Sequence, residues 1–289
     1  MRFRVSKALH LILAAIVGAV GAALLGAVAY LVAVQDRFVF QPSPRMQTTP
    51  ERLGLRYEEV RIASGSGSER GELYAWWIPA GQVDAPTFLY LHGNDKNISY
   101  IREVEYARRF HNLGYNVLMV DYRGYGRSTG GKPSEAKVYE DAESAWNYLI
   151  TQRLSPPQRT FIYGHSLGGA IAIDLAVRHP EAAGIVEDSS FTNIQAMAAV
   201  EFGFTPPTLL LREHFDSLGK IPQLKIPLLA IHGTWDKVVP YQLGQRLFEA
   251  APQPKTFKLI ESGEHENSCI VGSLECREAL SAFVRGNLR

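Results

Sequence analysis

The feature that most constrains this chain is an alternation, after residue 57, of short apolar runs with longer segments of helical spacing. Two runs on either side of a Gly/Ser-rich stretch, 57–62 and 73–78, predict an initial β-hairpin. The later runs are short and end at turn residues, as buried strands do. The alternation predicts one α/β domain with a mostly parallel, eight-stranded sheet and helices on both faces. The remaining strands are predicted at 87–91, 116–120, 160–163, 184–186, 227–231 and 256–260, and the helices at 101–113, 134–148, 167–177, 242–250 and 275–284.

A G-x-S-x-G motif lies at 164–168, directly between a predicted strand and a predicted helix. This setting is typical of a nucleophile elbow, whose tight turn presents a serine at the carboxyl edge of the sheet. The helix that follows adds a positive dipole end and free N–H groups behind the hydroxyl. Ser166 is therefore the predicted nucleophile.

A second match to the same pattern, at 126–130, has a different setting. It lies in the loop that begins at Asp121 and leads into Gly131-Lys132-Pro133, where no helix begins. Because the pattern is weak without its strand and its helix, we interpret Ser128 as a loop residue.

A serine hydroxyl is a poor nucleophile at neutral pH unless a base and an orienting acid accompany it. In folds of this type the chain order is Ser, then Asp or Glu, then His. Asp236 follows the next-to-last predicted strand and is the predicted acid, and His265 follows the last strand and is the predicted base. Asp188, with Glu187, ends an earlier strand and is the alternative acid.

Two other histidines lie close to these residues along the chain. His165 directly precedes the nucleophile, and we expect it to orient the turn rather than to transfer protons. His232 ends the strand before Asp236, and we expect it to pack there.

A tetrahedral intermediate needs two backbone N–H donors. Leu167, which follows the nucleophile, is one predicted donor. The loop after the first parallel strand supplies the other, and we favour the Asn94 N–H because Gly93 lets the backbone approach closely. The charged pair Asp95-Lys96 comes next and is expected near the mouth of the pocket.

Residues 8–34 form an apolar stretch that exceeds the roughly 20 residues needed for a helix to cross a bilayer. A single transmembrane helix is therefore predicted. A cleaved signal peptide is the alternative, because Ala27-Val28-Ala29 resembles a cleavage site. The apolar stretch is longer than a typical signal and continues past that site, which favours an uncleaved anchor.

Positive charge is concentrated before this stretch. By the positive-inside rule, the N-terminus is expected in the cytoplasm and the catalytic domain on the periplasmic or extracytoplasmic side of the membrane. The basic residues before the stretch are Arg2, Arg4 and Lys7, and Asp36 and Arg37 follow it.

The chain is therefore expected to contain a cytoplasmic basic segment, 1–7, a transmembrane helix, 8–34, a tether, 35–56, and a hydrolase domain, 57–289. Prolines discourage regular structure in the tether. Within the domain, the apolar segment 190–222 lies between two predicted strands and is interpreted as a short cap that lines an acyl pocket. Ordinary packing of this segment on the sheet is the alternative.

Charge and cysteine content exclude some functions. The chain has 30 basic and 29 acidic residues, a net charge of +1 and no long basic run, so nucleic acid is not an expected partner. The proposed chemistry requires no metal and no cofactor. No C-x-x-C zinc pattern is present. Cys269 and Cys276 would form a disulfide in an oxidising compartment, and two free thiols remain the alternative.

Taken together, these motifs resemble those of the Bem46-type α/β hydrolases, in which a preceding anchor helix is usual. The resemblance implies hydrolysis of a small-molecule or lipid ester or thioester, and the anchor and apolar cap favour a lipid or acylated substrate. A peptidase or amidase on the same fold and a catalytically inactive membrane scaffold are the alternatives. The motifs are His92-Gly93-Asn94 with Asn97, the run 121–128, the run 164–169, His232-Gly233 with Asp236 and Val239-Pro240, and Gly263 with His265.

Overall fold

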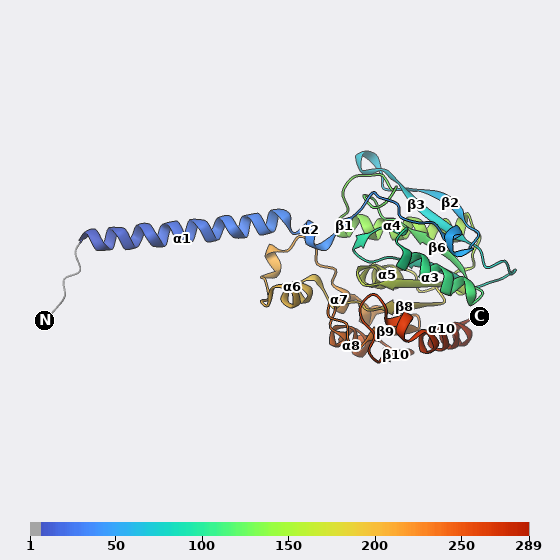
Figure 1. Cartoon of the computed structure of the whole chain (residues 1–289). Helices are drawn as coiled ribbons and strands as arrows, with labels where there is room; N and C mark the ends of the chain where they lie inside the picture. The colour runs from blue at the N-terminus through green and yellow to red at the C-terminus, as the bar shows by residue number, and fades with distance from the viewer. Residues whose placement is uncertain (1–6, 289) are drawn as a thin grey trace.

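The computed structural model describes residues 7–288, which form a long N-terminal helix and a layered α/β domain (Figure 1). Helix α1 (Lys7–Val34) extends away from the domain, and its stretch Leu9–Val34 is long and apolar enough to cross a membrane. Arg2 and Arg4, on which the predicted orientation depends, lie outside the described residues.

An eight-stranded sheet forms the centre of the domain. Its strands are β2 (Glu58–Ser64), β3 (Gly71–Ile78), β4 (Thr87–Leu91), β6 (Asn116–Val120), β7 (Thr160–His165), β8 (Gly184–Asp188), β9 (Leu228–Gly233) and β10 (Lys255–Ile260). The strand order is β10-β9-β8-β7-β4-β6-β3-β2. The six strands from β10 to β6 are parallel, whereas β3 is antiparallel to both β6 and β2. The predicted α/β-hydrolase fold, with its hairpin and mostly parallel sheet, is confirmed.

Helices cover both faces of this sheet. The principal ones are α3 (Ile101–Asn112), α4 (Glu135–Thr151), α5 (Leu167–Arg178), α8 (Tyr241–Ala250) and α10 (Ser273–Asn287). Side chains alternate along β4: Phe88 and Tyr90 pack in one core with α3 and α10, and Leu89 and Leu91 pack in the other with α4, α5 and α8. The apolar runs of the sequence thus form strands that are buried on both sides, as in parallel sheets generally.

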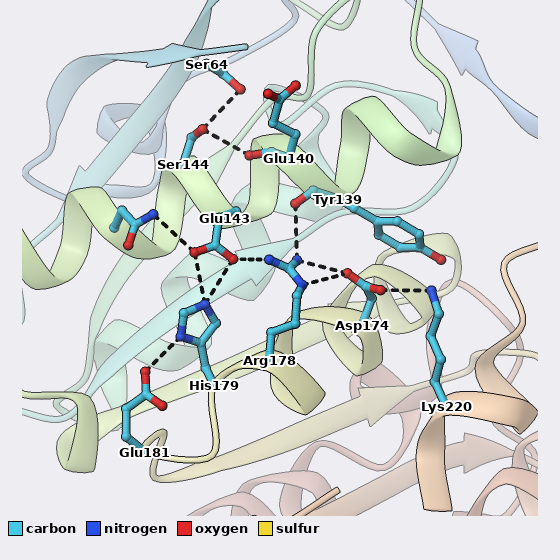
Figure 2. Close-up of polar contacts among 11 residues, drawn as sticks. Ser64, Tyr139, Glu140, Glu143, Ser144, Asp174, Arg178, His179, Glu181 and Lys220 are labelled. Carbon is cyan, nitrogen blue, oxygen red and sulfur yellow. Dashed lines mark hydrogen bonds and ion pairs between the residues drawn. The ribbon is translucent and has the colours of Figure 1, made fainter. Parts of the chain in front are cut away.

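Polar contacts tie α4, α5 and the short helix α7 (Ser217–Lys220) together on the outside of the helical layer (Figure 2). Arg178 contacts Glu143 and Asp174, and the His179 ring also lies against Glu143. Lys220 of α7 reaches Asp174 at 2.8 Å. This cluster lies at the end of α5 that is farthest from Ser166, so it supports the scaffold and not the site.

The segment between β8 and β9 forms the region predicted as a cap. It contains α6 (Ile194–Phe202), the 3-10 turn η4 (Thr208–Leu210), α7 and the 3-10 turn η5 (Ile221–Gln223). In Figure 1, α6 lies beside the end of α1 that is nearest the domain. The other short elements are η1 (Pro50–Leu53), η2 (Gly67–Glu69), η3 (Pro157–Arg159) and α9 (Ser268–Val271).

The start of the segment predicted as a tether lies against the domain. After α2 (Asp36–Val39), strand β1 (Gln41–Pro42) pairs in parallel with β5 (Asp95–Lys96). Phe40 is buried, and its ring lies 6.0 Å from that of Phe215. Helix α1 is therefore connected to the domain through a packed segment next to the loop that contains Asn94.

Candidate active site

Ser166 lies in a sharp turn between β7 and α5, at the carboxyl edge of the sheet. Its backbone has φ 55° and ψ −119°, a positive-φ conformation that is costly for a residue with a Cβ. Two glycines permit this turn, because a Cβ on Gly164 would collide with the Gly168 carbonyl group and one on Gly168 would collide with the Leu91 carbonyl oxygen. The sequence G-x-S-x-G is thus required by the backbone geometry that exposes the serine.

The structure brings Ser166, His265 and Asp236 together from the ends of β7, β10 and β9. His265 Nε2 lies 3.0 Å from Ser166 Oγ, and His265 Nδ1 lies 2.8 Å from Asp236 Oδ2. Since a carboxylate only accepts, Nδ1–H donates to Asp236, and Nε2 is left to accept from the serine hydroxyl. The arrangement can remove the hydroxyl proton while Oγ attacks a carbonyl carbon.

Asp236 is held as a carboxylate by its surroundings. Its Oδ1 accepts from the N–H groups of Val238 and Val239, at 2.9 and 2.8 Å. Burial alone would raise the pKa of Asp236, but hydrogen bonds from His232, His265 and the Val239 N–H outweigh burial and hold the pKa well below its usual range. A permanent negative charge is therefore available to stabilise a protonated His265.

His232 contacts Asp236, the predicted acid, and the sequence pattern did not predict this contact. Its Nε2 donates to the Val239 carbonyl at 2.9 Å and lies 3.3 Å from Asp236 Oδ2. Burial favours the neutral ring, yet the hydrogen bond with Asp236 and the charge of Glu187 raise the pKa of His232 overall. The four-residue spacing from His232 to Asp236 is the signal that was available, but spacing alone does not distinguish this contact from simple packing.

Glu187 is fully buried behind the site. Its Oε1 accepts from the Ser190 N–H at 2.6 Å. Burial raises the pKa of Glu187 to about 7, although the nearby His232 and the Ser190 N–H act in the opposite direction. Glu187 is thus a buried carboxyl group that titrates near neutral pH.

The alternative acid, Asp188, has other partners. Its carboxylate accepts from the hydroxyls of Tyr163 at 2.6 Å, Tyr106 at 3.0 Å and Ser189 at 3.0 Å. These contacts anchor the end of β8 in the core. The nitrogen of His265 that needs an acid is bonded to Asp236 instead, so the geometry favours Asp236.

His165 supports the loop that contains the base. Its Nε2 lies 3.0 Å from the His265 carbonyl oxygen, to which it can donate, and the two rings are 5.1 Å apart between centroids. His165, the last residue of β7, therefore positions the backbone of His265 from the strand that directly precedes Ser166. The second serine of the repeated pattern, Ser128, donates to the Asp121 carbonyl at 2.7 Å and lies in a loop.

Leu167 and Asn94, the predicted oxyanion donors, line the same pocket as Ser166. Leu167 is the first residue of α5, so its N–H has no carbonyl partner within the helix. The Asn94 carbonyl oxygen accepts from the Tyr125 hydroxyl at 2.7 Å and from the Gln41 N–H at 2.9 Å, which fixes this loop. A Cβ on the neighbouring Gly93 would lie 3.5 Å from Ser166 Cβ, so the loop passes close to the nucleophile.

A cavity of about 370 Å³ leads to Ser166 and His265. Much of its wall is apolar and comes from α2 and from the cap, through Phe38, Val39, Phe191, Ile194, Met197, Phe202 and Leu211. A larger cavity of about 710 Å³ lies between α3 and α10 and is lined by none of the predicted site residues. Within residues 7–288, no group of three or more His, Cys, Asp or Glu side chains is arranged to hold a metal ion.

The opposite side of the mouth is charged. Arg102 of α3 contacts Asp95 at 3.2 Å and Glu266 at 2.5 Å, and Asp95 also contacts Lys96 at 2.8 Å. Asp95 follows Asn94, a predicted oxyanion donor, and Glu266 follows His265. The ion pairs therefore connect the two loops that border Ser166 and give the pocket one polar side and one apolar side.

Cys269 and Cys276, whose state the sequence left open, form a disulfide that links α9 to α10. Cys269 lies four residues after His265, so the bond restrains the chain just beyond the predicted base. Disulfides persist in oxidising compartments such as the periplasm or the cell exterior.

The fold and this constellation at the strand ends define a protein of the α/β-hydrolase class. A family model described as "Serine aminopeptidase, S33" (Hydrolase_4) matches residues 85–217, a stretch that includes Ser166 but ends before Asp236 and His265. A Pyrococcus furiosus esterase has the same fold, with a TM-score of 0.73 and 22% identity over 87% of this chain and 99% of the esterase.

Curated relatives match most of the chain. An uncharacterized protein of Mycobacterium tuberculosis is 31% identical, with 90% of each chain covered. The α/β hydrolase domain-containing protein WAV2 of Arabidopsis thaliana is 31% identical over 87% of this chain and 88% of its own length. The human α/β hydrolase domain-containing protein 17B is 33% identical over 70% and 67%, respectively. The chain belongs to the α/β-hydrolase family and is a hydrolase.

Proposed function

We propose that this chain is a membrane-anchored serine hydrolase of carboxylic esters or thioesters, related to the Bem46-type enzymes. Ser166 is the nucleophile, His265 the base, Asp236 the orienting acid, and the Leu167 and Asn94 N–H groups form the oxyanion hole. The observation that carries the proposal is the continuous hydrogen-bond chain from Ser166 Oγ through His265 to Asp236, at an elbow that faces a cavity.

The first step is acylation of the serine. Ser166 Oγ attacks the acyl carbon while its proton passes to His265 Nε2, and the negative charge on the carbonyl oxygen is stabilised by the two N–H groups. His265 then gives the proton to the leaving alkoxide or thiolate as the C–O or C–S bond breaks. Asp236 stabilises the protonated imidazole without itself taking the proton.

The second step is deacylation. Water attacks the acyl-enzyme carbonyl while His265 Nε2 accepts one of its protons. Collapse of the tetrahedral intermediate breaks the bond to Ser166 Oγ, which recovers its proton from His265, and releases the carboxylic acid. The steps require no metal and no cofactor.

A lipid or other acylated substrate suits the pocket best. Apolar side chains from α2 and the cap line one wall, whereas the oxyanion loop and the Arg102 ion pairs form the other. An acyl chain has an apolar surface that gains free energy when it leaves water, at about 25 cal/mol per Å². The segment 190–222 accordingly acts as a short cap over an acyl site.

Residues 8–34 anchor the enzyme, with 1–7 in the cytoplasm and the domain, 57–289, beyond the membrane after the tether, 35–56. The length and apolar character of α1 support the anchor. The Cys269–Cys276 disulfide supports an extracytoplasmic domain, because such bonds are rare in the cytosol.

A peptidase is the second candidate, and the name of the matched family, serine aminopeptidase, favours it. The same nucleophile, base and oxyanion hole can cleave amides if the base protonates the leaving amine. Parallel assays with p-nitrophenyl acyl esters and aminoacyl p-nitroanilides separate the two, and we expect faster turnover of the esters.

A fluorophosphonate probe, which reacts with activated serines, tests the nucleophile. The wild-type chain in detergent is expected to label covalently, and Ser166→Ala to lose the label because no other hydroxyl is paired with His265 in the described residues. Ser128→Ala, in the other G-x-S-x-G match, is the control and is expected to label fully. Labelling that survives in Ser166→Ala and disappears in Ser128→Ala would overturn the proposal.

A further inference from the structure

Large apolar side chains on the outside of the cap are exposed to solvent. Leu209 is 86% exposed and Phe204 57%, and Val200 and Phe202 are also exposed. Phe38 of α2 is exposed beside them, with its ring 5.6 Å from that of Phe202. We call these five residues the cap face. Contiguous apolar surface of this kind marks a site of interaction with a protein or a membrane.

The cap face is fixed to the end of α1 by polar contacts. The Gln35 side chain, directly after α1, donates to the Leu210 carbonyl at 3.1 Å and accepts from the Arg212 N–H at 2.7 Å. Arg212 also lies 3.5 Å from Asp36. Because these contacts span about 175 residues of chain, the position of the cap relative to α1 is a property of the fold.

The bilayer should therefore lie next to the cap face. The apolar stretch Leu9–Val34 is about 39 Å long as a helix, which is more than the roughly 30 Å of a hydrocarbon core. Its C-terminal end thus reaches the interfacial region, where Gln35, Asp36 and Arg37 follow. In Figure 1, α6 lies beside that end. Aromatic side chains such as Phe202 and Phe204 then lie at the depth of the membrane–water boundary.

We infer that the cap face is a membrane-docking surface, covered by the lipid bilayer, and that the active-site pocket opens at this interface. The inference rests on the proposed membrane-anchored function. Its occupant is the lipid surface and not a second protein, because the cap face continues directly from the helix that enters the lipid.

This placement determines how a substrate reaches Ser166. Phe38 and Phe202 belong both to the cap face and to the wall of the pocket. An acyl chain can therefore pass from the lipid along apolar side chains to the nucleophile without crossing water. The substrate class that follows is a long-chain ester or thioester held in the same leaflet as the cap, whose cleaved polar part leaves on the side of Arg102 and Glu266.

A single introduced cysteine reports the docking directly. The chain has two cysteines, both in the disulfide, so Leu209→Cys can be labelled selectively with an environment-sensitive nitrobenzoxadiazole dye under non-reducing conditions. The full chain is reconstituted in phosphatidylcholine vesicles with or without shallow doxyl-labelled lipid. We expect a blue-shifted emission and strong quenching by the doxyl lipid.

Val83→Cys is the matched control. Val83 is 93% exposed and lies before β4, at the edge of the sheet opposite the pocket. Its label is expected to remain unshifted and to be quenched by aqueous iodide. A Leu209 label that behaves like the Val83 label overturns the inference. If protection of the Leu209 label from iodide increases with the amount of protein per vesicle at constant lipid composition, the cap face binds a second copy of the chain. That result also overturns the inference.

The rate of ester hydrolysis is an independent test of the docking surface. The variant Phe204→Gln/Leu209→Gln changes the cap face without touching a residue that lines the pocket. We expect it to hydrolyse a soluble short-chain ester as the wild type does, but a long-chain ester in vesicles severalfold more slowly. The control, Val83→Gln/Leu154→Gln, should retain both rates. Equal loss on both substrates, or on neither, contradicts the inference, whereas a chain without any esterase activity refutes the proposed function and leaves the dye measurement valid.

Discussion

Single residues define the chemistry, and their protonation states follow from their neighbours. The Asp236 carboxylate receives two backbone N–H groups and lies against two histidines, so it stays charged inside the protein. Ser166 and His265 are nearly buried, at 7% and 6% exposure, so a bound substrate would exclude most of the remaining water. The hydrogen bonds among Ser166, His265 and Asp236 are stronger in this buried environment than they would be in water.

Replacing the acid should damage catalysis more than binding. Asp236→Asn keeps the shape of the side chain but removes the charge that holds the His265 tautomer, so we expect kcat to fall by about 10⁴ with little change in KM. Steady-state kinetics on a p-nitrophenyl ester measures this. Asp188→Asn is the comparison, and the assignment of the acid is wrong if Asp188→Asn shows the large loss and Asp236→Asn does not.

Glu187 should make stability depend on pH. Because burial raises its pKa from 4.5 to about 7, the folded state favours the protonated form. Its stabilising contribution is therefore complete below about pH 4.5 and is lost as the pH rises to about 7. Glu187→Gln remains uncharged and should keep about 2 kcal/mol of unfolding free energy that the wild type loses between these values.

Denaturant unfolding of the purified chain at pH 5 and pH 8 measures the effect. The exposed Glu249→Gln on α8 is the control and should follow the wild-type dependence. If the unfolding free energies of Glu187→Gln and the wild type change equally between pH 5 and pH 8, Glu187 is already ionised at pH 5 in the folded protein.

Individual elements position these residues. The carboxyl ends of three parallel strands, β7, β9 and β10, bring the candidate site residues to one edge of the sheet. Segment β1 pairs with β5 and thereby supports the loop that contains Asn94, a predicted oxyanion donor. The short helix α9 is joined to the long helix α10 by the disulfide, whose Cys269 lies four residues after His265. The loop that contains Asn94 and the loop that follows His265 are thus each tied to an element that contains none of the candidate site residues.

Loss of the disulfide should loosen the loop that follows His265. A bond that closes a loop of this size is worth about 2 kcal/mol through the entropy of the unfolded chain. We expect Cys269→Ser/Cys276→Ser to lower the melting temperature and the rate of ester hydrolysis. Dithiothreitol should lower the melting temperature of the wild type similarly and leave the variant unchanged. Equal insensitivity of both proteins to the reductant would contradict the bond.

At the scale of the whole molecule, the apolar helix α1 and the α/β domain meet at the mouth of the candidate active site. Gln35 connects α1 to the cap, and Phe38 extends into the pocket wall. In the proposed membrane-anchored arrangement, α1 does more than raise the local concentration of enzyme at a membrane, because it also fixes which side of the domain faces the lipid.

The proposed orientation can be tested with reporters fused to the C-terminus in a bacterial host. Since the domain is expected outside the cytoplasm, alkaline phosphatase fused after Arg289 should be active and green fluorescent protein should be dark. N-terminal sequencing of the membrane-bound chain should begin near Met1 if α1 is retained. Cleavage after Ala29 would identify a signal peptide instead. A fluorescent fusion would show that the domain lies in the cytoplasm and contradict the proposed orientation.

The class of fold and the setting of Ser166 follow from the order of the residues alone. Strand and helix patterns depend on neighbouring residues, so the alternation predicts the order of strands and helices. The motif at 164–168 predicts a nucleophile elbow because a strand precedes it and a helix follows it. The same context separated Ser128 from Ser166. Chain order in this fold then selected Asp236 and His265 as candidates.

Only the tertiary structure decided which side chains meet. The contact of His232 with Asp236, the tyrosine hydroxyls on Asp188 and the attachment of Gln35 to the cap segment all join residues whose local sequence does not identify the partner. The physical reason is that such contacts depend on strand order, register and packing between distant segments, whereas local patterns record only the conformation of adjacent residues and the side that they bury.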